Sequence, residues 1–162
     1  MHFWRPFSAF LFYRKQSGAV SFIVGRVLPK SWFRHDKFPY AIYRFERGGK
    51  IYEKLRIKSW QKKLLDMSRI FPKLMPPKKF DFNGFARLPR MIQETCVAEL
   101  IHGLLCFSGL YCMEIWHGVG GKVIAALYFL GNLPFIFVQR YNRPRLLRLM
   151  NNTEERRNLC EC

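Results

Sequence analysis

One block of the chain, residues 96–138, is apolar and nearly free of charge. Residues 100–113 and 123–138 contain no charged side chain, and the glycine-rich stretch 117–121 separates them. Flanking residues extend each stretch toward the roughly 20 residues that cross a bilayer. The pattern predicts a transmembrane helical hairpin. The alternative is a hairpin buried in a soluble core, and the cationic composition of the remaining residues argues against it.

Each helix of this hairpin carries a stripe of small and polar residues. On the first helix, expected from Pro89 to about Met113, the stripe consists of Thr95, Glu99, His102, Cys106 and Gly109. On the second helix it consists of Gly121, Ala125, Tyr128, Asn132, Phe135, Gln139 and Asn142. Because residues three or four apart share a helix face, we expect the two stripes to pack together. Counting residues back from a turn near Val119 places His102 level with residues 132–135.

The N-terminal segment alternates apolar and charged stretches. Residues 7–13 and 17–28 are mostly apolar, but Arg14, Lys15 and Gln16 interrupt them. An interfacial anchor fits this pattern better than an uninterrupted span, and a degenerate first transmembrane segment is the alternative.

A second amphipathic pattern lies in the central region. Apolar residues recur there at spacings of three and four: Ile57, Trp60, Leu64, Met67 and Phe71. This predicts a basic amphipathic helix on the membrane surface. The alternative is that its apolar face packs on the hairpin as ordinary core.

Charge sharpens this picture. The 162 residues include 28 Lys and Arg against 11 Asp and Glu, a formal charge of +17. Lys122 is the only cation within residues 96–138. Since Lys and Arg favour the cytoplasmic side, we expect the basic regions in the cytoplasm and the turn near Gly118 outside. No nucleic-acid-binding motif is present, and topology explains the cations without such a partner.

These patterns together predict an all-α fold, a small integral membrane protein with a transmembrane hairpin and amphipathic interfacial helices. We expect four segments along the chain. They are an N-terminal anchor (1–28), a basic cytoplasmic or interfacial region (29–88), the hairpin with its basic edge (89–150) and a flexible tail (151–162). The five cysteines lack the spacing of a disulfide framework, and we expect no metal site.

Candidate chemistry lies where polar residues enter the apolar block. An ionisable residue in a membrane helix costs about 3 kcal/mol on insertion scales, so Glu99 and His102 are candidate catalytic residues. The alternative is structural: Glu99 pairs with Arg140 or Arg143, and His102 is a hydrogen-bond donor between the helices.

A dense polar string follows the second apolar stretch. It contains two amides and three arginines: Gln139, Arg140, Asn142, Arg143 and Arg145. Planar guanidinium groups suit a carboxylate, a phosphate or sugar hydroxyls, whereas a simple positive-inside anchor would need no amides.

These residues resemble one bacterial family. The matching segments are Glu94–Thr95, residues 98–102, Asn132 with Pro134, and residues 139–146. Further similarity runs from Arg26 through Phe45–Glu46, Gly49–Lys50 and Trp60 to Leu65–Asp66, so about residues 26–148 are covered. The chain resembles the glycosyl-4,4'-diaponeurosporenoate acyltransferases of carotenoid synthesis. Arg14 and Lys15 depart from the hydrophobic first segment expected of that family.

The resemblance implies a bacterial cell-membrane enzyme that esterifies a sugar hydroxyl of a glycosylated carotenoid with a fatty acyl group. The donor is then a co-substrate, acyl-CoA or acyl-ACP, and no cofactor is bound. Partners are the lipid membrane and the glycosylated apolar acceptor, and a complex with other enzymes of the pathway stays open.

Acyl transfer needs a base, an oxyanion donor and a grip on the acyl carrier. We expect His102 to be the base and Glu99 to orient it. Asn142, Arg140 or Asn132 would hold the oxyanion, and Arg143 and Arg145 the carrier phosphates. Glu94 and Gln139 complete the predicted substrate-binding set. The alternatives are a non-catalytic membrane scaffold and another membrane transferase, such as a methyltransferase.

Overall fold

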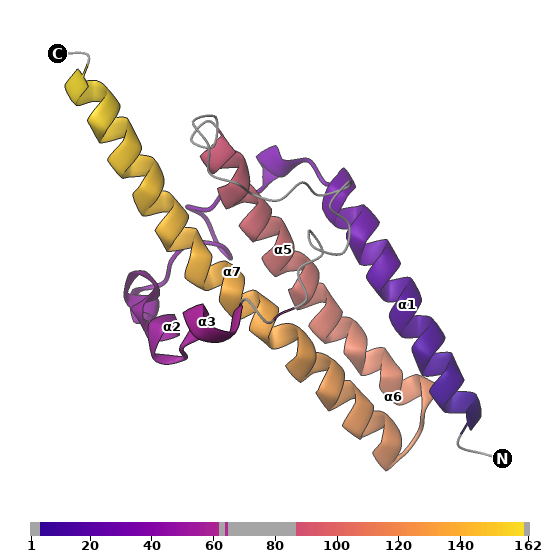
Figure 1. Cartoon of the computed structure of the whole chain (residues 1–162). Helices are drawn as coiled ribbons and strands as arrows, with labels where there is room; N and C mark the ends of the chain where they lie inside the picture. The colour runs from indigo at the N-terminus through magenta and orange to yellow at the C-terminus, as the bar shows by residue number, and fades with distance from the viewer. Residues whose placement is uncertain (1–3, 62–63, 65–86, 161–162) are drawn as a thin grey trace. The chain divides into compact units, whose positions relative to one another are not determined.

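The computed structural model describes residues 4–61, 64 and 87–160, and every regular element among them is a helix. The long helices are α1 (Trp4–Val27), α5 (Leu88–Ser108) and α7 (Val119–Cys160) (Figure 1). The short ones are η1 (Lys30–Trp32), η2 (Arg44–Gly49), α2 (Lys50–Lys54), α3 (Ile57–Trp60), η5 (Gly109–Tyr111) and α6 (Cys112–Ile115). The predicted all-α class is confirmed.

The chain forms two compact units. The first contains Met1–Pro29 and Val97–Ile136, and the second contains Lys30–Cys96 and Phe137–Cys162. Helices α5 and α7 therefore each contribute one part to each unit.

Two helical stretches of the described chain are long and apolar enough to cross a membrane. They are Leu88–Ile115, which joins α5, η5 and α6, and Val119–Arg156 within α7. The predicted hairpin is confirmed at these positions, with its turn between Ile115 and Val119. The 42 residues of α7 extend about 63 Å, roughly twice the hydrocarbon thickness, so a spanning α7 projects well beyond the apolar layer.

Helix α1 continues without a break through Arg14 and Lys15, whose side chains are both exposed. It packs on the hairpin within the first unit. Tyr13 donates its hydroxyl hydrogen bond to the Ser108 carbonyl at 2.8 Å, and the Ser17 and Tyr128 hydroxyls lie 2.8 Å apart. The charged residues that separate the two apolar stretches thus lie on the exposed side of one continuous helix. Helix α1 is not one of the two stretches apolar enough to span.

The predicted stripes meet along the hairpin. The backbone of Gly109 lies so close to Tyr128 that a methyl group on Gly109 would come within 2.8 Å of the tyrosine ring. Farther along, the Cys106 thiol donates to the Phe129 carbonyl at 3.6 Å. Ala125 is also buried. Small side chains therefore let the two helices approach closely, as the stripes predicted.

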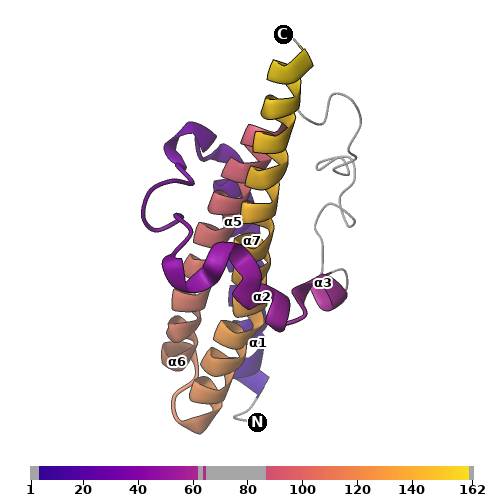
Figure 2. The same cartoon turned by 90° about the vertical axis from the view of Figure 1, so that its left-hand side faces the viewer.

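In the second unit, α2 and α3 lie against α7 (Figure 2). Tyr52 and Ile57 pack with Tyr141 of α7, and Trp60, Phe137 and Val138 surround this cluster. The helix predicted over residues 57–71 is shorter than expected. α3 ends at Trp60 and Leu64 lies in a bend, whereas Met67 and Phe71 fall outside the described residues. Ile57 is fully buried, so its role is core packing, and the membrane-surface interpretation is wrong for it.

Replacing Gly109 tests the close approach of the helices. We expect Gly109→Ala to cost about 1–3 kcal/mol, because the added methyl must displace a tyrosine ring whose hydroxyl contacts Ser17. Gly103 on α5 is the matched control, since a methyl group there meets no atom within 4 Å. Gly103→Ala should leave stability equal or higher. Thermal unfolding of both variants in detergent micelles measures the difference, and equal midpoints would contradict this packing.

Candidate active site

His102 contacts α7 twice within the first unit. Its Nδ1 lies 3.1 Å from Oδ1 of Asn132, and its ring stacks on Phe135 with centroids 4.5 Å apart. His102 was predicted to lie at the same height along the hairpin as residues 132–135, and these contacts confirm it. The Asn132 amide Nδ2 donates to the Tyr128 carbonyl at 2.8 Å, which directs Oδ1 toward the histidine.

This arrangement selects one tautomer of the neutral imidazole. An amide oxygen only accepts hydrogen bonds, so the proton must lie on Nδ1 of His102. Nε2 then keeps its lone pair and acts as a hydrogen-bond acceptor. The side chain has the form that a general base requires.

Glu99 lies on α5 three residues before His102 and is half-buried. Residues at this spacing share a helix face, as the sequence pattern predicted. The role of Glu99 in orienting His102 stays a prediction.

Glu46 receives hydrogen bonds from three groups in the second unit. Its side chain is buried, and Oε2 accepts from the Tyr43 backbone N–H at 2.9 Å. Oε1 accepts from the Tyr52 hydroxyl at 2.5 Å and from Nη1 of Arg140 at 2.7 Å. Burial and the bond to Glu46 raise the pKa of Tyr52 above its ordinary range, so the phenol remains a donor.

Arg140 makes three contacts with the chain between Pro39 and Glu46. Besides Glu46, it donates from Nη2 to the Pro39 carbonyl at 2.6 Å, and its guanidinium lies 4.8 Å from the centroid of the Tyr43 ring. Sequence reasoning assigned no role to Glu46. Two features of the sequence could have pointed to Glu46. It is the single carboxylate in the strongly basic stretch 44–50, and it lies in a segment that carries the family resemblance.

Arg143 is 1% exposed, so it lies deeper than any other arginine in the described chain. Its Nε donates to the Thr95 hydroxyl at 2.9 Å, and Nη1 donates to the Tyr40 carbonyl at 2.6 Å. Thr95 in turn donates to the Ile92 carbonyl. Within the second unit, Arg143 thus joins α7 to the first turns of α5 and to the loop around Tyr40.

The other predicted binding residues of the second unit have more exposed positions. Glu94 accepts from the Lys30 ammonium at 2.7 Å. Gln139 and Asn142 are half-buried on α7. Arg145 is exposed, and its Nη1 donates to the Tyr141 hydroxyl at 2.6 Å.

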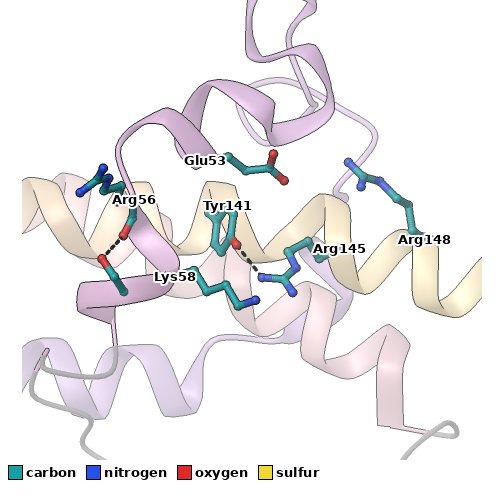
Figure 3. Close-up of a pocket in the computed structure, with 7 residues that line it drawn as sticks. Glu53, Arg56, Lys58, Tyr141, Arg145 and Arg148 are labelled. Carbon is teal, nitrogen blue, oxygen red and sulfur yellow. Dashed lines mark hydrogen bonds between the residues drawn. The ribbon is translucent and has the colours of Figure 1, made fainter.

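Arg145 also lines an open depression of about 810 Å³, here called the basic hollow (Figure 3). Both α7 and the α2–α3 segment contribute to it. Its lining residues are Glu53, Arg56, Lys58, Ser59, Tyr141, Arg145 and Arg148. Four of these seven carry a positive charge and one carries a negative charge. Arg148, Arg56 and Lys58 were not among the sequence-predicted site residues.

The predicted site residues thus form two groups. His102 and Asn132 are in contact in the first unit. In the second unit, Glu46 holds Arg140, and Thr95 and Tyr40 hold Arg143; these arginines and Arg145 are here called the arginine string. That the two groups act on one substrate stays a prediction.

Comparison with known proteins gives a consistent result. Residues 29–152 match the family described as glycosyl-4,4'-diaponeurosporenoate acyltransferase. A protein of that name from Staphylococcus aureus (strain N315) is 30% identical over 135 residues, which cover 82% of this chain and 81% of the relative. The protein of the same name from strain MRSA252 is 28% identical over 138 residues, with the same coverage. No solved structure matches the chain.

Removing the Glu46 carboxylate tests how the arginine string is held. Glu46→Gln leaves the Arg140 charge buried without its counterion, and such a loss costs about 3–5 kcal/mol. We expect the double variant Glu46→Gln with Arg140→Gln to lose less than the sum of the two single variants. Denaturant unfolding in detergent micelles measures these free energies.

Asp36 provides the matched control. Its carboxylate is paired with Arg34, whose hydrogen bond lowers the pKa of Asp36 to about 2, but both side chains are exposed. Asp36→Asn should therefore change stability little. Equal destabilisation by Asp36→Asn and Glu46→Gln would overturn the structural role given to the buried pair.

Proposed function

Because the chain belongs to the glycosyl-4,4'-diaponeurosporenoate acyltransferase family, we propose that it esterifies a sugar hydroxyl of glycosyl-4,4'-diaponeurosporenoate, or of a related glycolipid, with a fatty acyl group. The chain is an acyltransferase, and its substrate is a lipid. The family match covers the central region and both apolar helices, so it includes His102 and the arginine string.

The observation that carries the mechanism is the contact between His102 and Asn132. A sugar hydroxyl is a poor nucleophile until a base accepts its proton as the oxygen attacks the acyl carbonyl. Nε2 of His102 is the acceptor that this step needs, because the Asn132 oxygen holds the proton on Nδ1. Stacking on Phe135 fixes the plane of the ring. The side chain is thus held in place before the substrate binds.

The same histidine completes the reaction. The hydroxyl oxygen forms a bond to the acyl carbon, and the carrier leaves as a thiolate when the tetrahedral intermediate collapses. The proton taken by Nε2 passes to that thiolate, which restores the neutral imidazole. Glu99, one turn earlier on α5, is proposed to stabilise the imidazolium between these two steps.

The polar edge of α7 is proposed to bind the head groups of the substrates. Asn142 and Gln139 are half-buried amides and suit the oxyanion and the sugar hydroxyls. Arg140 and Arg143 hold this part of α7 in place through their hydrogen bonds to Pro39, Tyr40, Glu46 and Thr95. Glu94 and Arg145 lie nearer the surface and complete the binding set, and the proposed donor is an acyl carrier, acyl-CoA or acyl-ACP.

We place the enzyme in the bacterial cell membrane with its basic regions in the cytoplasm. The apolar parts of α5 and α7 supply the two spans, and Lys and Arg flank their outer ends. In this orientation the apolar polyene and acyl chain lie in lipid, while the sugar and the carrier meet at the interface.

Replacing His102 tests the proposed base. We expect His102→Ala to lower the initial rate of ester formation about 100-fold or more, the range usual for loss of a general base. Glu99→Gln should lower it less, because the base itself remains. The measurement uses protein in lipid nanodiscs with a glycosylated carotenoid acceptor and an acyl thioester donor.

His117→Ala is the control, because His117 is exposed at the hairpin turn and should leave the rate unchanged. Insertion and thermal unfolding of each variant show whether the loss is one of folding. A well-inserted His102→Ala, Glu99→Gln double variant that esterifies at the normal rate would exclude this catalytic role and favour a non-catalytic scaffold.

A further inference from the structure

We propose that the basic hollow binds the phosphate groups of coenzyme A, so that coenzyme A is the carrier of the acyl donor. This inference rests on the proposed acyl transfer and adds to it the identity and the binding site of the carrier. The hollow is formed entirely within the second unit by α7 and the α2–α3 segment (Figure 3).

The charge of the hollow indicates an anionic ligand. Arg56 and Lys58 line it from one side, and Arg145 and Arg148 from α7, against the single carboxylate of Glu53. All four cations are exposed, and none has a carboxylate partner among the described residues. Like charges gathered in one concave surface repel one another until an anion neutralises them.

The two α7 arginines are held in place while most of their donors remain available. Arg145 donates one hydrogen bond to the Tyr141 hydroxyl and lies 5.0 Å from the centroid of that ring. Arg148 donates through Nη2 to the Gly48 carbonyl. A guanidinium has five N–H groups, so each arginine keeps several for a ligand, in the planar geometry that fits phosphate oxygens.

The backbone of the α2–α3 segment, which faces α7 across the hollow, is strained at Arg56. Arg56 adopts a φ of 50°, a left-handed conformation that is uncommon for a residue other than glycine. The next residue, Ile57, is fully buried in the core with Tyr52 and Tyr141, and this packing holds the turn. The strained turn brings Arg56 and Lys58 to the same depression as Arg145.

Size and position favour coenzyme A over a protein carrier or a single lipid phosphate. The hollow is an open depression lined by seven residues, a size that suits the phosphate groups of one small molecule better than the broad surface of a carrier protein. Coenzyme A carries a diphosphate and a further ribose phosphate, enough to engage several cations at once. Arg145 and Arg148 follow the uncharged stretch 123–138 by about 10–15 Å along α7, which in the proposed orientation is the cytoplasmic end of the second span.

The test measures coenzyme A binding to the full chain in nanodiscs of neutral lipid. We expect Arg145→Gln with Arg148→Gln to weaken binding about tenfold for each lost guanidinium contact. Arg56→Gln with Lys58→Gln should weaken it similarly, which keeps the test valid if one double variant folds poorly. Arg14→Gln with Lys15→Gln removes the same charge from exposed positions of α1 and should have no effect.

Three outcomes would overturn the proposal. The first is wild-type affinity in both hollow variants, and the second is an equal loss in the α1 control. The third is loss of coenzyme A binding when phosphatidylglycerol replaces part of the neutral lipid, which would assign the hollow to a lipid headgroup.

Measuring ester formation alongside coenzyme A binding distinguishes a wrong binding site from a wrong reaction. His102→Ala should bind coenzyme A normally while esterification is lost. If the hollow variants esterify with an unchanged KM for acyl-CoA, the binding site is wrong and the enzyme activity stands. If coenzyme A binds through the hollow but no ester forms with the wild-type chain, the proposed reaction is wrong and the binding site stands.

Discussion

The second unit depends on one buried ion pair, between Glu46 of η2 and Arg140 of α7. Taking two charges out of water is costly, so such a pair is tolerated only when its other polar atoms are also satisfied. Here Tyr43, Tyr52 and the Pro39 carbonyl supply those bonds. The pair fixes η2 and α2 on α7, where Gly49, with a φ of 95°, packs so closely on Pro144 that a side chain at this position would clash. Because η2 and α2 are held on α7 in this way, the α2–α3 segment lies where it can form one side of the basic hollow.

Helix geometry explains why the four arginines within residues 140–148 of α7 perform two tasks. Each residue turns the helix by about 100°, so Arg140 and Arg143 share one side and Arg145 and Arg148 share another. The first two reach inward to Glu46, Thr95 and Tyr40. The second two reach the hollow. The inward pair holds the framework, and the outward pair remains available to a ligand.

Periodicity predicted much of the fold. The stripes follow from spacings of three and four, which regular helices preserve over long distances. The hairpin follows from its two uncharged stretches, and the level of His102 against Asn132 follows from counting residues back from the turn. Most partners of Arg140 and Arg143 could not be predicted in this way, because Pro39, Tyr40, Tyr43 and Glu46 lie in irregular chain or in the short helix η2, where no long period relates one residue to the next. The helix expected over 57–71 was too long because the apolar spacing continues past Trp60, where the regular helix ends. Arg14 and Lys15 interrupt the apolar stretch of the N-terminal segment but not α1 itself, since exposed charges are compatible with a continuous helix.

The most direct test of acyl transfer is the identity of the product. The purified chain in nanodiscs would receive glycosyl-4,4'-diaponeurosporenoate and an acyl-CoA with an isotopically labelled chain, and the lipid extract would be analysed by tandem mass spectrometry. We expect a new species that carries the labelled acyl group as an ester on the sugar, formed with release of free coenzyme A. An extract from correctly folded protein with no labelled ester above the protein-free control would contradict it.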